Sequence, residues 1–222
     1  EMRRIGKGNA ERRWDMLPQQ PALAYDLAQN RLIVTAAVLQ PPVFDPADPA
    51  TVYGAFAALV GNQLTRAVDG RGARVDAGGA LRDWWTPAER AAWARLGERL
   101  AAQLAAHDSP GVPGAKVDGG RVKDETLADL AGLELAWQAW SAAHPQADQA
   151  EHQAFFRAWS RLWAQQVGGN VAAGRLAADI HAPGPLRSNV PLANLPAFAT
   201  VWGCQPGQPM RMPEAGQVRV WR

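Results

Sequence analysis

The sequence has one cysteine, two tyrosines and no long run of apolar residues. Because Cys204 is alone, an internal disulfide framework and metal sites built from CxxC pairs are excluded. No apolar segment approaches the ~20 residues that a membrane-spanning helix needs. Neither charge sign dominates: 23 basic and 21 acidic residues give a net charge of +2. Bulk charge therefore does not favour nucleic acid as a partner, and only a local patch would bind a polyanion.

What the sequence has in quantity is apolar residues, at 47% of its 222 residues. The length fits one large domain or two small ones, and the sequence has no internal repeat or low-complexity linker, so we expect one domain over residues 1–222. Tryptophan is also abundant, with ten residues. Four of them are spaced three or four apart, which favours helix core over a ligand cage: Trp137, Trp140, Trp159 and Trp163.

The residue pattern predicts mostly helix with few, short strands. A β-branched run predicts a strand over 31–39, and Thr86-Pro87-Ala88-Glu89 has the form of a capping box. Helices are expected over 50–69, from 87 to about 107, from near 124 to before 145, over 149–167, in a short stretch to 179 and briefly after 194. The first helix is expected to bury Val52, Phe56, Leu59, Val60 and Leu64, and the third Leu127, Leu130 and Leu133.

Two of the predicted helices carry polar pairs. Asn62 and Arg66 are four residues apart and share a face, with Gln63 roughly 100° around the helix. Glu125 and Asp129 form a second pair with the same spacing. Spacing alone leaves two interpretations open: each pair lies on a solvated edge, or the pairs belong to a functional site.

The segment from Leu39 to Pro87, which begins LQPPVFD and ends RDWWTP, resembles the zinc-motif region of the neprilysin family of metallopeptidases. Three later segments are also similar to motifs of that family, in the same order: Val117–Leu133, Ala154–Trp159 and Asp179–Phe198. The resemblance implies a mainly α fold with a small β-sheet (α+β), the thermolysin-like (gluzincin) metallopeptidase catalytic domain.

In a working family member, two histidines of an H-E-x-x-H helix and a later glutamate bind zinc, and the motif glutamate is the general base. Matched residue by residue, Asn62 and Arg66 stand at the histidine positions and Gln63 at the base position. Glu125 stands at the third ligand position. The resemblance therefore implies a degenerate site that has lost zinc and peptidase activity, that is, a pseudopeptidase.

The resemblance assigns roles to further residues. Asp129 matches the carboxylate that orients a ligand histidine, and Asp69 matches a supporting acid. His181 matches the residue that stabilises the tetrahedral oxyanion, and Arg187 the one that holds a substrate carbonyl. The stretch Ala22–Tyr25 aligns with the strand that pairs with the substrate backbone, although the family's asparagine is missing from it.

Arg66 is the substitution with the largest electrostatic consequence. An arginine is always charged, and a +1 charge about 5 Å from Zn²⁺ costs about 6–7 kcal/mol at an effective dielectric constant near 20. We therefore expect Arg66 to take the place of the ion and to reach Glu125, Asp129 or both. The alternative is that Arg66 points to solvent and leaves both carboxylates hydrated.

Three functional classes follow. In the first, the chain is a binding module whose cleft, lined by Arg187 and His181, holds peptides without cutting them. In the second, it is an active zinc metalloendopeptidase that uses unrecognised ligands, and in the third its role is structural. The remaining histidines offer no replacement zinc site, since none has a histidine or cysteine three or four residues away: His107, His144 and His152.

The resemblance covers only the C-terminal portion of such peptidases. It implies that an N-terminal lid region is absent from this chain, that this region of the same protein is a partner, and that the basic start at Arg3 and Arg4 marks a junction. It further implies a disulfide from Cys204 to that region, with a lone half-buried thiol as the alternative. Bacterial members are frequently exported, so a periplasmic or secreted location is expected.

Overall fold

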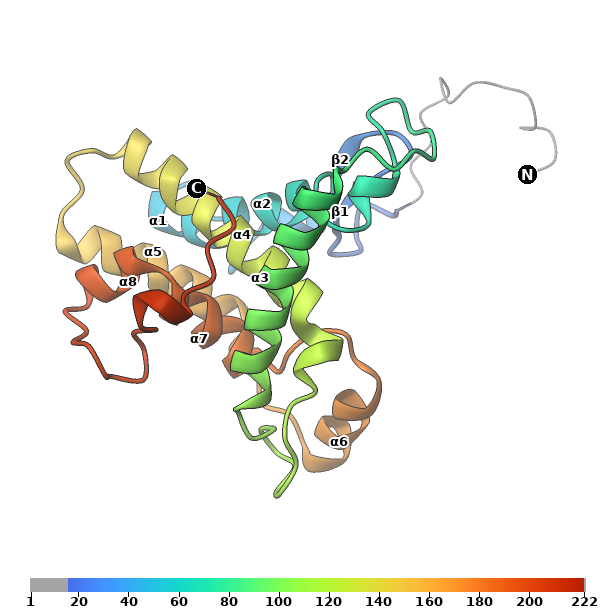
Figure 1. Cartoon of the computed structure of the whole chain (residues 1–222). Helices are drawn as coiled ribbons and strands as arrows, with labels where there is room; N and C mark the ends of the chain where they lie inside the picture. Colours follow the sequence, from blue (N-terminus) through green and yellow to red (C-terminus); the bar gives the residue numbers. More distant parts are fainter. Residues whose placement is uncertain (1–15, 222) are drawn as a thin grey trace.

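The computed structural model describes residues 16–221 and is mainly helical, with one small sheet, as predicted. The basic start at Arg3 and Arg4 lies outside the described residues. The strands β1 (Leu23–Asp26) and β2 (Arg31–Val34) pair antiparallel, with Leu23 opposite Val34. This hairpin lies at one end of the molecule in Figure 1.

The helices follow the hairpin in chain order. They are α1 (Pro49–Thr51), the π-helical turn η3 (Val52–Ala57), α2 (Ala58–Thr65), α3 (Pro87–Ala105), α4 (Gly119–Ala143), α5 (Gln149–Leu162), α6 (Gly169–Ala178), α7 (Gly184–Asn194) and α8 (Pro196–Val201). Short 3-10 turns lie at Ala36–Val38, Gly72–Arg74 and Glu214–Gly216. Within residues 16–221, none of the helices combines the length and apolar character that a membrane crossing requires.

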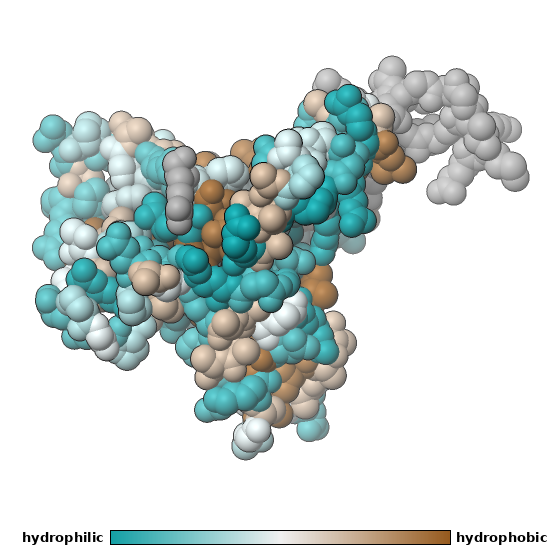
Figure 2. Space-filling model, in the orientation of Figure 1, coloured by the Kyte–Doolittle hydropathy of each residue, from teal (hydrophilic) through white to brown (hydrophobic). Residues whose placement is uncertain are grey.

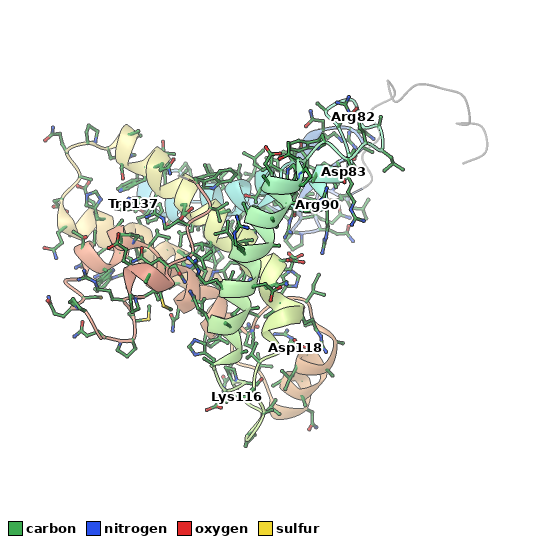
Figure 3. The ribbon with its side chains drawn as sticks, in the orientation of Figure 1. Arg82, Asp83, Arg90, Lys116, Asp118 and Trp137 are labelled. Carbon is green, nitrogen blue, oxygen red and sulfur yellow. The ribbon has the colours of Figure 1, made fainter. Side chains whose placement is uncertain are left out.

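The core is built around α4, which packs against α2, α3 and α7. Leu127, Leu130 and Leu133 are fully buried, which confirms the predicted face of this helix. The tryptophan prediction is confirmed for three of the four residues. Trp140 and Trp159 are buried, and Trp137, labelled in Figure 3, stacks on Phe156 with 4.8 Å between ring centroids. The exception is Trp163, which follows the end of α5, is half-buried and lies under the Arg187 guanidinium.

The buried face of α2 differs from the prediction. Leu64 is 44% exposed, and the other four large apolar residues expected inside are only half-buried. Small residues occupy the buried face instead, and Gly61 meets Gly132 of α4 so closely that a Cβ on Gly61 would lie 2.8 Å from the Gly132 Cα. Because the two helices approach this closely, the polar residues of α2 are brought directly against α4.

Several predicted boundaries are also corrected. The strand ends at Val34, because the Thr35 hydroxyl bonds back to the carbonyls of Gln20 and Ala22 and a 3-10 turn follows. The helix α4 starts at Gly119, where the Asp118 side chain caps it. The helix α7 was expected to be a loop. Pro185 stands in its first turn, a position that a helix accommodates, whereas Pro191 lies inside the helix. Two helices end earlier than predicted, at Thr65 and Leu162.

Candidate functional site

The two polar pairs predicted from sequence face each other between α2 and α4. Asn62 is 3% exposed, Glu125 6% and Asp129 0%. The side chain of Arg66 is 12% exposed. The solvated-edge interpretation is therefore wrong for both pairs. Since buried charges need partners, the hydrogen bonds of these four side chains determine what the site can do.

Arg66 forms an ion pair with Glu125 across the two helices. Its other amino group lies 3.3 Å from the Asp69 carboxylate, and Arg71 lies 3.4 Å from the second oxygen of Glu125. Asp69 is held in place because its carboxylate accepts the backbone N–H groups of Arg71 and Gly72. The alternative in which Arg66 points to solvent is wrong. Arg71 is a part of this cluster that sequence reasoning missed.

Asp129 has different partners from those expected. Asn62 Nδ2 donates to Asp129 Oδ1 at 2.7 Å, and Arg187 binds both carboxylate oxygens at 2.7 and 2.8 Å. The Arg187 guanidinium also stacks over the Trp163 ring at 3.7 Å. Asp129 is thus occupied by Asn62 and Arg187, and the predicted contact from Arg66 to Asp129 is replaced by the one to Asp69.

Gln63 joins this network to the sheet. Its Nε2 donates to Asn62 Oδ1 at 2.8 Å, and its Oε1 accepts the backbone N–H of Tyr25 at 3.2 Å. Tyr25 belongs to β1, the strand expected to pair with a substrate backbone. One continuous series of hydrogen bonds therefore links β1, α2, α4 and α7, and it ends at Arg187.

His181 stands at the edge of the same cluster. Its Nδ1 lies 3.0 Å from Asp179 Oδ1, and its Nε2 lies 3.6 Å from Glu125 Oε2. Partial burial raises the pKa of Asp179, but the hydrogen bonds from the backbone N–H and ring of His181, with the charge of Arg175, lower the pKa of this carboxyl overall. Asp179 therefore orients the His181 ring while remaining ionised. Cys204 is half-buried and forms no disulfide within residues 16–221.

A cavity of 590 Å³ opens beside His181 and Arg187, between α4, α5, α6 and α7. Apolar side chains line much of it, among them Val122, Leu162, Leu176 and Ala172. The lobe that carries α6 shows brown hydrophobic patches at its surface in Figure 2. A concave apolar space with a few convergent polar groups is the usual form of a small-ligand or side-chain pocket.

Removing the Asp129 carboxylate is expected to be costly. Asp129→Ala leaves the Arg187 guanidinium half-buried without its bidentate partner, which predicts a loss of about 3–5 kcal/mol in the free energy of unfolding. Urea denaturation followed by tryptophan fluorescence measures it. Asp124→Ala, at an exposed position on the same helix, is the matched control and is expected to change stability by less than about 0.5 kcal/mol. Equal losses in the two variants would contradict the assignment.

A mainly helical scaffold that brings Glu125, Asp129, His181 and Arg187 together, the last two lining a cavity, is the arrangement that the resemblance to neprilysin-like metallopeptidases implies. The model of peptidase family M13 matches residues 24–218. The chain belongs to this family, which confirms the resemblance read from the sequence.

Individual relatives agree. The chain is 29% identical over 198 residues to the neutral endopeptidase of Lactobacillus helveticus and 28% identical over 218 residues to human endothelin-converting enzyme 1, covering 89% and 94% of this chain. Among solved structures, the zinc metalloprotease ZMP1 of Mycobacterium tuberculosis, in complex with an inhibitor, superposes with a TM-score of 0.90 at 30% identity and covers 97% of this chain.

The match is to part of each relative. The chain spans 29% of the bacterial neutral endopeptidase, 28% of the human enzyme and 35% of the mycobacterial structure.

Proposed function

We propose that this chain is a pseudopeptidase: a member of the family that binds neither zinc nor the transition state of peptide hydrolysis, and holds peptides in a cleft that it has kept. The observation that carries the proposal is the buried ion pair between Arg66 and Glu125. A protein cation there takes the position that the resemblance assigns to a metal ion.

The donor set does not suit zinc, which favours imidazole and thiolate ligands. Asn62 uses its amide nitrogen on Asp129, and Arg66 brings a permanent positive charge to the surviving carboxylate. Within residues 16–221, no group of three or more histidine, cysteine, aspartate or glutamate side chains is arranged to hold a metal. The substitutions are also balanced in charge. Zn²⁺ with a motif glutamate sums to +1, and so does Arg66 with the neutral Gln63.

The loss of activity is supported by the chemistry of Gln63. A carboxamide does not accept a proton from water at neutral pH, and general-base catalysis typically contributes 10²–10⁴-fold. Both ends of the Gln63 amide are also engaged, by Tyr25 and by Asn62. The side chain is therefore a structural link between β1 and α2.

Peptide binding is supported by the cavity beside His181 and Arg187. Its apolar lining would accept a hydrophobic side chain, while the exposed part of His181 would donate to, or accept from, a peptide backbone. No catalytic group is needed for this role. A pocket retained beside a metal position that Arg66 occupies would bind a peptide without cleaving it.

Metal content tests the first half of the proposal. Protein purified without chelator or metal-affinity resin is expected to contain less than about 0.1 zinc per chain by elemental analysis, since one carboxylate next to a guanidinium is a poor site. Close to one equivalent of zinc would overturn the proposal and support the alternative, an active zinc metalloendopeptidase. A protease assay with and without chelator accompanies the measurement, and no chelator-sensitive cleavage is expected.

Peptide affinity tests the second half. A labelled hexapeptide with a central phenylalanine, followed by fluorescence anisotropy, is expected to bind at least tenfold more weakly to the variant Ala172→Phe, because the new ring occupies the cavity. Ala173→Phe is the matched control, since this neighbour on α6 is exposed and lies outside the cavity lining. Equal binding to both variants, or none to the unaltered chain, would contradict a peptide-binding cleft.

A further inference from the structure

A second concave surface lies away from the site described above. It is a groove of 490 Å³ formed by α5, α7, α8 and the segment that follows α8. These three helices pack together at one side of the molecule in Figure 1. None of its lining residues also lines the first cavity, although both surfaces use α5 and α7. The two surfaces are therefore distinct.

The groove has an aromatic floor. Phe156 and Phe198 are 1% and 9% exposed and contact each other edge to face, with 5.4 Å between ring centroids. Trp202 extends this floor to the surface, where it is 39% exposed, and its ring centroid lies 6.1 Å from that of Phe198. A partly exposed tryptophan beside buried aromatic rings is the kind of surface at which a bulky apolar side chain binds.

Basic side chains form the rim. Arg157 stacks over Trp202 at 5.2 Å and donates to the neutral side chain of Gln153. Arg161 lies one turn further along α5, is exposed, and has neither an ion pair nor a side-chain hydrogen bond within residues 16–221. No acidic residue lines the groove. From residue 152 to residue 213 the sequence has five arginines and one acid, Asp179, which belongs to the other site.

We infer that this groove docks an acidic peptide segment that carries one bulky apolar side chain. The apolar side chain would lie on the floor beside Trp202, and flanking carboxylates would pair with Arg157 and Arg161. The partner is argued from charge complementarity: Arg157 and Arg161 form no ion pair within residues 16–221, and no acid lines the groove, so carboxylates supplied from outside would pair with them. The inference concerns a protein partner and is independent of peptide binding in the first cavity.

Three labelled ten-residue peptides test it, followed by fluorescence anisotropy on the intact chain. The first has a central tryptophan flanked by glutamates, the second replaces the glutamates with glutamines, and the third replaces the tryptophan with serine. The first is expected to bind, with an affinity that falls as salt is raised, and the other two at least tenfold more weakly.

Two charge-reversal variants identify the groove. Arg161→Glu is expected to weaken binding of the first peptide at least tenfold, and it leaves folding intact because Arg161 has no internal partner. Arg95→Glu is the matched control, an exposed arginine on α3 with an equal charge change, and is expected to bind as the unaltered chain does. Trp202→Ala is expected to weaken binding as well, and Ala172→Phe to leave it unchanged.

Three outcomes would overturn the inference. Equal binding of the glutamine peptide would mean that charge plays no part. Binding of a ten-residue oligouridine, lost in Arg161→Glu, with no binding of the acidic peptide would make the groove a nucleic-acid site. Dimerisation in sedimentation velocity that Trp202→Ala abolishes, again without peptide binding, would mean that a second copy of this chain covers the groove.

Discussion

The combined substitutions Asn62→His, Gln63→Glu and Arg66→His are expected to raise the bound zinc from less than about 0.1 to about one equivalent per chain. Elemental analysis after dialysis against micromolar zinc measures the change. No other alteration of the chain should be necessary, because the remaining residues of the site still stand around the same point between α2 and α4.

The structure gives two reasons for this result. Asn62 Nδ2 already donates to Asp129 at 2.7 Å, which is the bond that the ring N–H of a histidine at this position would make. Glu125 is buried and paired with Arg66, so removal of that guanidinium leaves its Oε2 facing position 66, with the exposed Arg71 side chain still on Oε1. The contact of Gly61 with Gly132 holds the two helices at this separation whatever residue stands at 62 or 66.

The matched control keeps the arginine. Asn62→His with Gln63→Glu supplies one imidazole and the base but leaves Arg66 beside Glu125, so zinc should stay below about 0.1 equivalent, given a repulsion of about 6–7 kcal/mol. If the double variant bound zinc as well as the triple one, Arg66 would not be the residue that excludes the metal. If the triple variant bound none, the scaffold would have diverged beyond these three positions.

The sequence predicts the long helices well where local signals are strong. The box at Thr86 and Glu89 forms both of its reciprocal hydrogen bonds and starts α3, and the leucines of α4 are buried as expected. These features depend on residues within one turn of each other. They can therefore be predicted from the sequence without knowledge of the partner helix.

The face of α2 was not predictable in the same way. Large apolar residues usually mark the buried side of a helix, but here Leu64 is exposed, the other large residues are only half-buried, and glycine and alanine lie inward. The reason is the close approach of α4, which leaves no room for a larger side chain. The distance between two helices is a tertiary property, so the hydrophobic periodicity of one helix does not reveal it.

Some contacts of the candidate site could be predicted from the sequence, and others could not. The resemblance, together with the permanent charge of Arg66, predicts that Arg66 meets Glu125, and the structure contains that pair. The bond from Tyr25 to Gln63 and the pairing of Arg187 with Asp129 join residues 38 and 58 positions apart. Only the folded chain reveals these contacts, and the second of them, with the bond from Asn62, occupies the Asp129 carboxylate.

Gly132→Ala is expected to have the largest effect on stability of any single substitution considered. A Cβ on Gly132 would lie 2.3 Å from the Asn62 nitrogen and 2.4 Å from the Ala58 carbonyl oxygen. Both are backbone atoms of α2, so no side-chain rotation relieves the clash. The helices would have to separate, which predicts a loss of more than about 4 kcal/mol in the free energy of unfolding, or no folded protein.

Gly97→Ala is the matched control, because Gly97 is a buried helical glycine that also faces α4. The nearest atom to its Cβ would be Lys123 Cδ at 3.7 Å, an ordinary contact, so this variant should be about 0.5–1 kcal/mol more stable than the unaltered chain. Thermal unfolding by circular dichroism compares the two. Should Gly132→Ala fold as stably as Gly97→Ala, the helices are not in contact at this point. The pairing of Arg66 with Glu125 would then lack its physical basis, because that pair spans the distance which the two glycines set.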